Sequence, residues 1–308
     1  MSNQPDYGLL LDAEVQAYIA KGAEFYPPNA VDLTVAEQRE VYDNMCAAFH
    51  GGRPEGVKTW DEPHGDVACR RYEAGPAEVT LIYYHGGGFV VGGLHSHDDV
   101  CAELCARAGV RVISVDYGLA PETVFPGCYN DAAAAFEGIE AAFGGTILMA
   151  GDSAGGNLAA AVTHHARDRI AGQILIYPGL GGDPTKGSYV AHANAPELTT
   201  RDMLFYQTIR TGGAKSPVGD ARYAPLHDDD FRGLPNTVIV TAQCDPLSSD
   251  GESYRNAVSA AGGKAVWFNE AGLVHGCLRA RNMSTRGAAF FKRVSDAVAA
   301  LAKGQWPY

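Results

Sequence analysis

The chain has 308 residues, of which 46% are hydrophobic and 19% charged, as in an ordinary globular protein, and its length suits one large domain with a lid. A formal net charge of −12 makes nucleic acid and anionic membrane surfaces unfavourable partners. No stretch approaches 18 consecutive apolar residues, so we expect no membrane-spanning helix.

The start of the chain and its cysteines indicate a cytoplasmic protein. Residues 1–6 lack the basic and apolar regions of a secretory signal peptide, so we expect none. Seven cysteines are scattered along the chain without the spacing of a zinc site. Free buried thiols in a reducing compartment account for them most simply.

Residues 1–50 are predicted to be helical. Thr34 and Glu37 have the spacing of a capping box for the second helix. One face of the first helix carries apolar residues at helical spacing, namely Leu11, Val15, Tyr18 and Ile19. Because no strand alternates with these helices, they form either part of a cap over a binding site or a simple packing arm. We prefer the cap.

From Val57 onward, the pattern alternates between strands and helices and predicts a mainly parallel sheet. Val57–Trp60 and Val67–Tyr72 are expected to pair antiparallel at one edge. Six further strands are predicted at Val79–Tyr84, Val110–Val115, Thr146–Ala150, Gln173–Tyr177, Thr237–Thr241 and Lys264–Phe268. Helices are predicted between them, including one at Val100–Ala108 that Ser96 and Asp99 would cap, and a closing helix at Ala288–Leu301.

An insertion interrupts this alternation between Asp183 and Pro217. Thr199 and Asp202 can cap a helix there, with apolar positions at Met203, Phe205, Tyr206 and Ile209. The insertion is therefore predicted to be the second half of the cap. The expected organisation is cap helices at 1–50, an α/β core at 51–182 and 218–308, and a cap insertion at 183–217.

The strand Thr146–Ala150 leads into a Gly-x-Ser-x-Gly motif centred on Ser153. A serine hydroxyl must stand clear of the sheet for a base to reach it, which requires a strained turn between strand and helix. Gly151 and Gly155 lack the Cβ atoms that would clash there. The following helix directs its N-terminal amides toward the serine, which suits a developing oxyanion. Ser153 is thus the predicted nucleophile.

Three further stretches support this assignment. The strand Val79–Tyr84 ends in His85 and three glycines, a loop whose bare backbone amides can approach a substrate oxygen. Asp245 follows the strand Thr237–Thr241, and His275 lies in a loop after the last strand. The order serine, acid, histidine is the one expected for a catalytic triad in an α/β-hydrolase.

These motifs resemble those of the hormone-sensitive-lipase-like esterases, a bacterial branch of the α/β-hydrolases. The resemblance rests on His85–Gly88, Gly151–Gly155, Asp116–Glu122, Asp245–Leu247 and His275–Gly276, within residues 55 to 300. Gly118 and Ser248 depart from the family pattern, which usually has arginine at the first position and often at the second. The departures affect local ion pairing rather than the triad.

The resemblance implies an α/β-hydrolase fold with a mainly parallel eight-stranded sheet, flanking helices and a helical cap. It also implies oxyanion-binding amides at Gly87 and Gly88, joined by that of Ala154. The candidate substrate-binding residues are Phe89, Phe205, Leu247 and Leu278. The implied activity is hydrolysis of small acyl esters by a carboxylesterase, without a metal or cofactor. Relatives often pair through the last strand, so a homodimer is one expected assembly.

Two other functions stay open from the sequence. Some relatives bind small molecules without catalysis after losing a triad member, although all three members are present here. An amidase or deacetylase would use the same triad but needs a better proton donor for its leaving group.

Several other polar residues have competing interpretations. His85 is interpreted as orienting the glycine loop, and Asp152 is the rival to Asp245 as the triad acid. The cluster His95–Asp99 has metal-ligand residue types but no distant third group. His164 and His165 are expected to be packing or surface residues. Asp228–Asp230 lacks the spacing of a calcium loop and is expected to be solvated.

Overall fold

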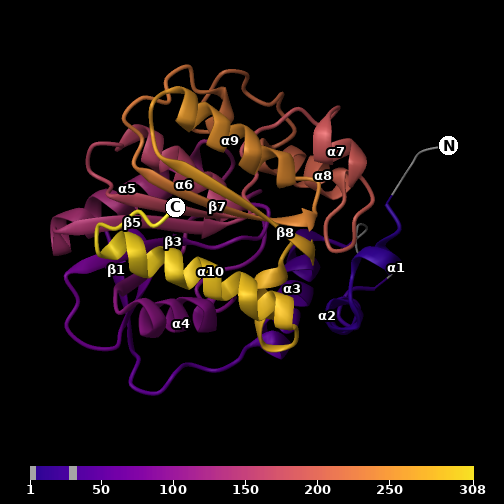
Figure 1. Cartoon of the computed structure of the whole chain (residues 1–308), viewed down its shortest axis with the longest axis horizontal. Coiled ribbons are helices and arrows are strands. Elements are labelled where there is room, and N and C mark those ends of the chain that lie inside the picture. The colour runs from indigo at the N-terminus through magenta and orange to yellow at the C-terminus, as the bar shows by residue number, and fades with distance from the viewer. Residues whose placement is uncertain (1–4, 28–32) are drawn as a thin grey trace.

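The computed structural model describes residues 5–27 and 33–308. A single eight-stranded sheet lies between two layers of helices (Figure 1). The strand order is β1-β2-β4-β3-β5-β6-β7-β8, in which β1, β2 and β4 pair antiparallel and the neighbours from β4 to β8 pair parallel. The strands are β1 (Lys58–His64), β2 (Val67–Glu73), β3 (Val79–Tyr84), β4 (Arg111–Val115), β5 (Thr146–Asp152), β6 (Gly172–Ile176), β7 (Asn236–Cys244) and β8 (Ala265–Val274). The predicted fold class is confirmed.

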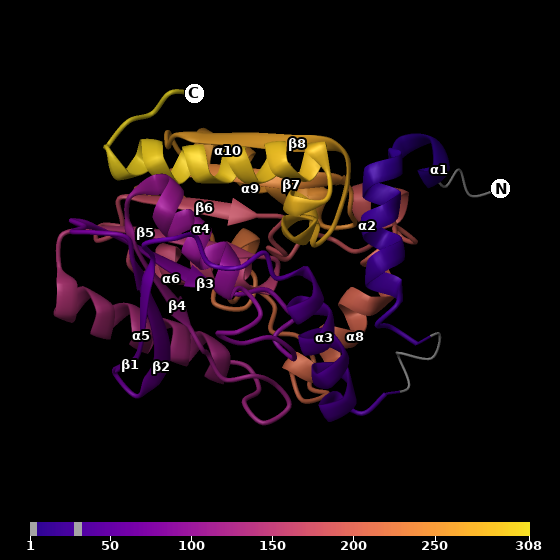
Figure 2. The ribbon, with the colours of Figure 1, turned by 90° about the horizontal axis from the view of Figure 1, so that it is seen from below.

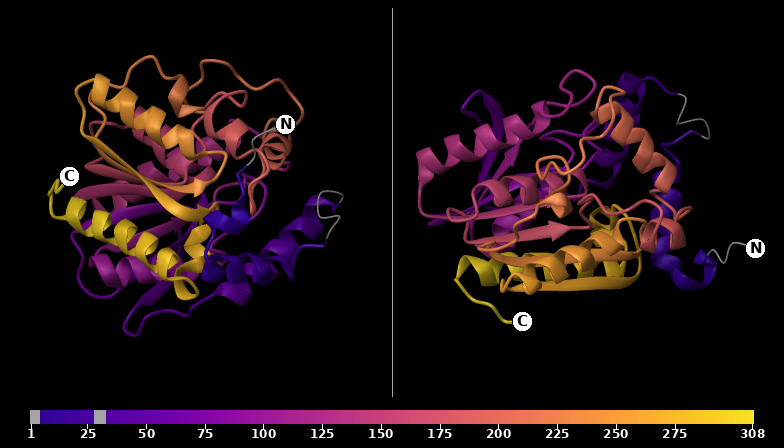
Figure 3. Two further views of the ribbon diagram at one scale, coloured as in Figure 1. Left: turned by 45° about the vertical axis from the view of Figure 1, so that its right-hand side comes forward. Right: turned by 90° about the horizontal axis from the view of Figure 1, so that it is seen from above.

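Both faces of the central strands are buried, which explains why these strands read as continuous apolar runs. In β3, Leu81 and Tyr83 belong to the core on one face, whereas Ile82 and Tyr84 belong to the core on the other. Helices α4 and α10 cover the first face, and α5, α6 and α9 cover the second (Figures 1 and 3). The sheet therefore forms a rigid platform whose strand ends can hold side chains in fixed positions.

The helices include those expected at Val100–Ala108 and Ala288–Leu301, which begin two and three residues earlier than predicted, and a short one at Gly187–Ala191 that the sequence did not predict. They are α1 (Tyr7–Leu10), α2 (Ala13–Ala23), α3 (Val35–Phe49), α4 (Asp98–Ala108), α5 (Gly127–Phe143), α6 (Ala154–His165), α7 (Gly187–Ala191), α8 (Thr200–Arg210), α9 (Ser248–Ala260) and α10 (Thr285–Ala302), with 3₁₀ turns η2 (Pro225–His227) and η3 (Cys277–Asn282).

The helix caps agree with the sequence in two cases and differ in a third. Capping boxes are present at Thr34 before α3 and at Thr199 before α8. The box expected from Ser96 and Asp99 is wrong. Helix α4 begins after His97 without a side-chain cap. The Ser96 hydroxyl instead donates to the Gly93 carbonyl oxygen at 2.8 Å, and Asp99 accepts the Gly51 amide at 2.8 Å. Both side chains therefore bond to other segments instead of capping the helix.

Helices from the two ends of the predicted cap gather beyond the ends of the parallel strands. Figure 2 shows α2, α3 and α8 together on the side toward which β6 and β8 point. Val15 and Tyr18 of α2 are buried. Among the described residues, none of the helices combines the length and apolar character needed to cross a bilayer.

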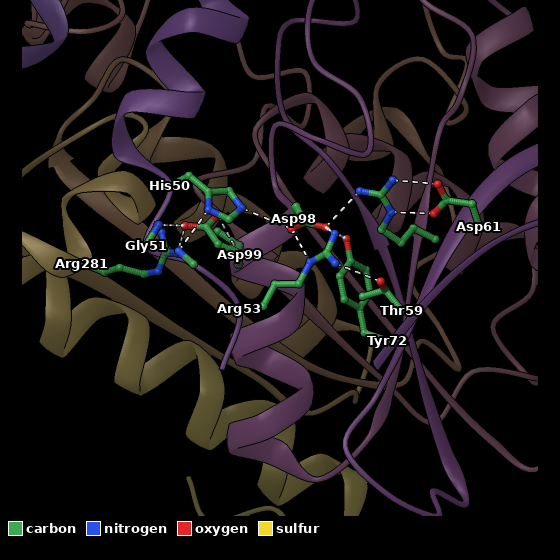
Figure 4. A network of polar contacts seen from close by, with 12 residues as sticks. His50, Gly51, Arg53, Thr59, Asp61, Tyr72, Asp98, Asp99 and Arg281 are labelled. Carbon is green, nitrogen blue, oxygen red and sulfur yellow. Dashed lines mark hydrogen bonds and ion pairs between the residues drawn. The ribbon is translucent and has the colours of Figure 1, made fainter. Parts of the chain in front are cut away.

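A buried ion network fixes the segment after α3 to the start of α4 (Figure 4). Arg53 donates to both carboxylate oxygens of Asp98 at 2.7 and 2.9 Å, and Tyr72 donates to the same group at 2.9 Å. Arg281 from η3 pairs with the neighbouring Asp99. Burial opposes ionisation of Asp98, but the hydrogen bonds from Arg53 and Tyr72 outweigh it and lower its pKa to about 2. The network thus joins the N-terminal helices to the core.

Candidate active site

Ser153 stands on a sharp turn between β5 and α6. Its backbone has φ 55° and ψ −115°, a conformation that L-residues adopt only under constraint. A Cβ on Gly155 would lie 1.9 Å from the Tyr84 carbonyl oxygen, and one on Gly151 would lie 2.3 Å from the Gly155 carbonyl oxygen. The two glycines therefore permit the close backbone approach that the turn requires.

Strands β7 and β8 bring the acid and the base to the same edge of the sheet. Asp245 directly follows β7, and His275 directly follows β8, which runs six residues beyond the predicted Phe268 end. His275 Nε2 lies 2.9 Å from Ser153 Oγ, and its Nδ1 lies 2.7 Å from Asp245 Oδ2. Asp245 is fully buried, and its other oxygen accepts the Leu247 amide at 2.8 Å. This geometry suits transfer of the serine proton to the imidazole.

The glycine loop after β3 lies against the serine turn. Gly87 has φ 129° and Gly88 has φ 60°, values that favour glycine. The Gly87 carbonyl oxygen accepts the Val90 and Val91 amides, both at 3.0 Å, and these bonds hold the loop in a compact turn. Gly87, Gly88 and Ala154 line the same cavity as Ser153 and His275.

Asp152 has a different function from the one its position beside the serine suggested. Its carboxylate accepts the Tyr83 hydroxyl at 2.8 Å and the Gly86 amide at 2.9 Å, and His97 Nε2 lies 3.1 Å away. Burial opposes ionisation of Asp152, but the charge of His97 and these hydrogen bonds lower its pKa. Asp152 thus ties the start of the glycine loop to the end of β5, while Asp245 contacts His275.

His85 also supports the glycine loop, in agreement with its interpretation from the sequence. Its Nδ1 lies 2.8 Å from the Gly86 carbonyl oxygen, and its ring stacks on Tyr117 with centroids 4.4 Å apart. Burial lowers its pKa to about 3, so the ring is neutral and Nδ1–H donates to that oxygen. His85 is therefore a positioning residue, too tightly packed to act as a base.

The acids and histidines of the His95–Asp99 cluster point to separate partners. His95 Nε2 lies 2.7 Å from Asp43, His97 contacts Asp152, and Asp98 and Asp99 belong to the network of Figure 4. Across residues 5–27 and 33–308, no three His, Cys, Asp or Glu side chains are grouped to hold a metal ion.

The other polar candidates lie away from the serine. His164 is buried between Asp228 and Tyr254, whereas His165 is exposed. Asp230, near Asp228, forms an ion pair with Arg232. His164 is therefore a packing residue, whereas His165 and Asp230 are surface groups.

A cavity of about 480 Å³ adjoins the triad. Three of the predicted substrate-binding residues line it, namely Phe89, Phe205 and Leu247. Leu278 requires a correction, because its side chain is fully buried in the core and is not among the lining residues. Helices α2, α3 and α8 supply much of the wall, including Tyr18, Met45 and Tyr206. Sequence reasoning missed Glu197 and Arg279, which also line the cavity, because a lone charged residue looks like a surface residue in the sequence.

The two departures from the family pattern have local structural explanations. A Cβ on Gly118 would lie 2.6 Å from Thr123 Oγ1, so the loop as packed leaves no room for a side chain. Arg39 from α3 instead pairs with Glu122 of this loop and donates to the Ala120 carbonyl oxygen at 3.0 Å. Ser248 is buried at the start of α9, where its amide donates to the Asp245 carbonyl oxygen at 3.2 Å.

Comparison with known proteins shows to which family the chain belongs. A model of the α/β-hydrolase fold matches residues 81–279. The carboxylic ester hydrolase LipN of Mycobacterium tuberculosis is 35% identical over 270 residues, which cover 81% of this chain and 72% of LipN. The ethyl acetate hydrolase of Pseudomonas putida is 30% identical over 271 residues, which cover 83% of this chain and 81% of that protein.

Solved structures agree with these sequence matches. An ester hydrolase from the metagenome of Lake Arreo, in complex with a derivative of bipyridine phosphonate, superposes with a TM-score of 0.85 at 32% identity, over 96% of this chain and 99% of the other. An esterase of the bacterial hormone-sensitive lipase family shares the fold at 23% identity, with a TM-score of 0.84 over 94% of this chain and 99% of the other. The resemblance inferred from the sequence is thereby confirmed, and the chain belongs to the α/β-hydrolase family, among its carboxylesterases.

Proposed function

We propose that the protein hydrolyses short-chain acyl esters through an acyl-enzyme formed on Ser153. The observation that carries this proposal is the continuous chain of contacts from Asp245 through His275 to Ser153, at 2.7 and 2.9 Å, in the wall of a cavity. The cavity volume of about 480 Å³ favours small esters over triglycerides.

The proposed reaction uses this geometry. His275 takes the Ser153 proton while the hydroxyl attacks the ester carbonyl carbon, and Asp245 stabilises the resulting imidazolium. The amides of Gly87, Gly88 and Ala154 donate to the oxyanion of the tetrahedral intermediate. His275 then gives its proton to the leaving alkoxide, and the acyl group remains on Ser153. Water repeats the same steps, releases the carboxylic acid and restores the serine.

Replacing Ser153 by alanine tests the proposal. Turnover of p-nitrophenyl acetate should fall by about a millionfold, because only the oxyanion site and substrate binding would remain. A phosphonate probe should label the wild-type protein on Ser153, as mass spectrometry of the peptide can show. A variant that keeps a tenth of the activity would mean that Ser153 is not the nucleophile.

The same assay separates the other two functions. A series of p-nitrophenyl esters from acetate to decanoate should show a maximum at the short acyl chains. Absence of turnover together with tight ester binding would instead indicate a binding protein. Faster cleavage of p-nitroacetanilide than of the ester would indicate an amidase.

A further inference from the structure

Glu197 and Arg279 line the same cavity as Ser153, and the proposed reaction uses neither of them. Three other charged residues of the cavity wall bond to the protein: Asp152 accepts the Tyr83 hydroxyl, Asp202 caps α8, and Arg210 donates to the Tyr223 carbonyl oxygen. Glu197 lies between α7 and α8, and Arg279 lies in η3, four residues after His275. They are far apart in the chain, and the fold brings both to the wall of one cavity. Charged groups in a small ester cavity need an explanation, because burial penalises them.

Arg279 is a buried cation with few partners. Its side chain is 8% exposed, and its Nη2 donates to Tyr42 Oη at 2.8 Å and Cys46 Sγ at 3.1 Å. Its Nε has no hydrogen-bond partner, and within the described residues no carboxylate lies at ion-pair distance. Arg281, two residues later, is equally buried but pairs with Asp99 and Glu103. Arg279 Nε is itself shielded from solvent, so what the cavity offers is the Arg279 charge, which no carboxylate of the described residues neutralises by contact.

The Glu197 carboxylate could in principle neutralise the Arg279 charge, yet the two side chains form no ion pair. Its backbone has φ 70°, and its carboxylate lies beside Gly22 of α2, where an added Cβ would be 3.8 Å from Oε1. The charged and titratable groups that act on it are Arg279, His275 and Tyr18, with Tyr26 also within electrostatic reach.

Glu197 changes charge in the neutral range. Burial raises its pKa to about 7, against the smaller opposing effects of Arg279 and His275. Below pH 7 the carboxyl is mostly neutral and leaves the Arg279 charge unopposed. Above pH 7 it is ionised and repels any second anion in the cavity.

We propose that Arg279 and Glu197 form a polar subsite of the cavity that selects esters bearing a second, free carboxylate, such as half-esters of short dicarboxylic acids. Arg279 would donate to that carboxylate, and a neutral Glu197 would tolerate it. The inference rests on the proposed esterase function, and it adds a substrate class that the triad by itself does not specify.

Rates with matched esters test this subsite. Monoethyl succinate carries the carboxylate, and ethyl pentanoate is a neutral ester of similar length. At pH 6 the wild type should have the higher kcat/KM for monoethyl succinate, and the ratio of the two values should fall several-fold as the pH rises to 8.5. The succinate carboxyl stays ionised over this range, since an unperturbed carboxyl titrates near 4.3. A ratio that favours ethyl pentanoate at pH 6 would overturn the proposal.

Two variants assign the effect to the named residues. Arg279→Met should lower the ratio by about 10- to 100-fold, the value of a hydrogen bond to a charged group. Because this change also removes contacts to Tyr42 and Cys46, Glu197→Gln provides a test that leaves Arg279 intact. In Glu197→Gln the ratio should stay high and independent of pH, whereas Glu24→Gln, an exposed control, should retain the wild-type decline.

The outcomes distinguish this inference from the underlying function. If ethyl pentanoate and p-nitrophenyl acetate are both hydrolysed but the ratio in Glu197→Gln falls with pH as it does in the wild type, the subsite is refuted and the esterase stands. If no ester is hydrolysed, the proposed function fails first, and the subsite fails with it.

Discussion

Replacing Gly155 by alanine would place a methyl group where the serine turn meets β3. The added Cβ would lie 1.9 Å from the carbonyl oxygen of Tyr84, 2.4 Å from its carbonyl carbon and 2.6 Å from the carbonyl oxygen of His85. All three contacts are to backbone, so no side-chain rotation can relieve them. Either α6 moves away from β3, or the glycine loop after Tyr84 shifts.

The size of the required movement sets the expected effect. Ordinary contact with a Cβ begins at 3.4 Å, so the Tyr84 oxygen and the new methyl group must separate by about 1.5 Å. That displacement moves Ser153 and Ala154 relative to Gly87 and Gly88. A misplacement of about 1 Å can cost on the order of 100-fold in rate, so we expect kcat to fall by at least about 100-fold. Overpacking should also lower the free energy of unfolding by about 1–3 kcal/mol.

Hydrolysis of p-nitrophenyl acetate and urea unfolding would measure the two effects. Gly75→Ala is the matched control, because it makes the same substitution at an exposed site with no atom within 4 Å. The control should keep its rate and stability. A Gly155→Ala protein with more than half of the wild-type kcat would refute the argument that this glycine is required by close backbone approach.

Further substitutions probe the acids. Asp245→Asn should lower kcat by about 10⁴-fold, because the imidazole would be held in the wrong tautomer. If Asp152→Asn lowers kcat by a larger factor, Asp152 is the acid of the triad instead. Asp98→Asn should lower the free energy of unfolding by about 3 kcal/mol by leaving its arginine partners unpaired, and thermal unfolding with unchanged kcat would check this. Burial raises the pKa of Asp250 to about 6, so its stabilising contribution is complete below about pH 4 and is lost as the pH rises through 6. The unfolding free energy of the wild type relative to Asp250→Asn should therefore fall by about 3 kcal/mol between pH 3 and 8, and a constant difference would contradict this assignment.

The sequence by itself determined the elements and the residues that meet at the edge of the sheet. Ser153, Asp245 and His275 each follow a strand that apolar runs identify locally, and the carboxyl ends of parallel strands share one edge of a sheet. Knowing the strands therefore sufficed to bring together three residues that are far apart in the chain. The capping boxes at Thr34 and Thr199 could also be predicted from the sequence, because each depends only on residues within one helical turn.

Only the tertiary structure decided which residues line the cavity and what the other polar groups do. Asp99 had the spacing of a helix cap, but its carboxylate is held by Arg281 and the Gly51 amide from distant segments. Leu278 and Arg279 are adjacent in η3, yet one is buried in the core and the other lines the cavity. Such outcomes depend on the direction of each side chain in a packed interior. Contacts between segments remote in the chain set that direction, and no local pattern encodes them.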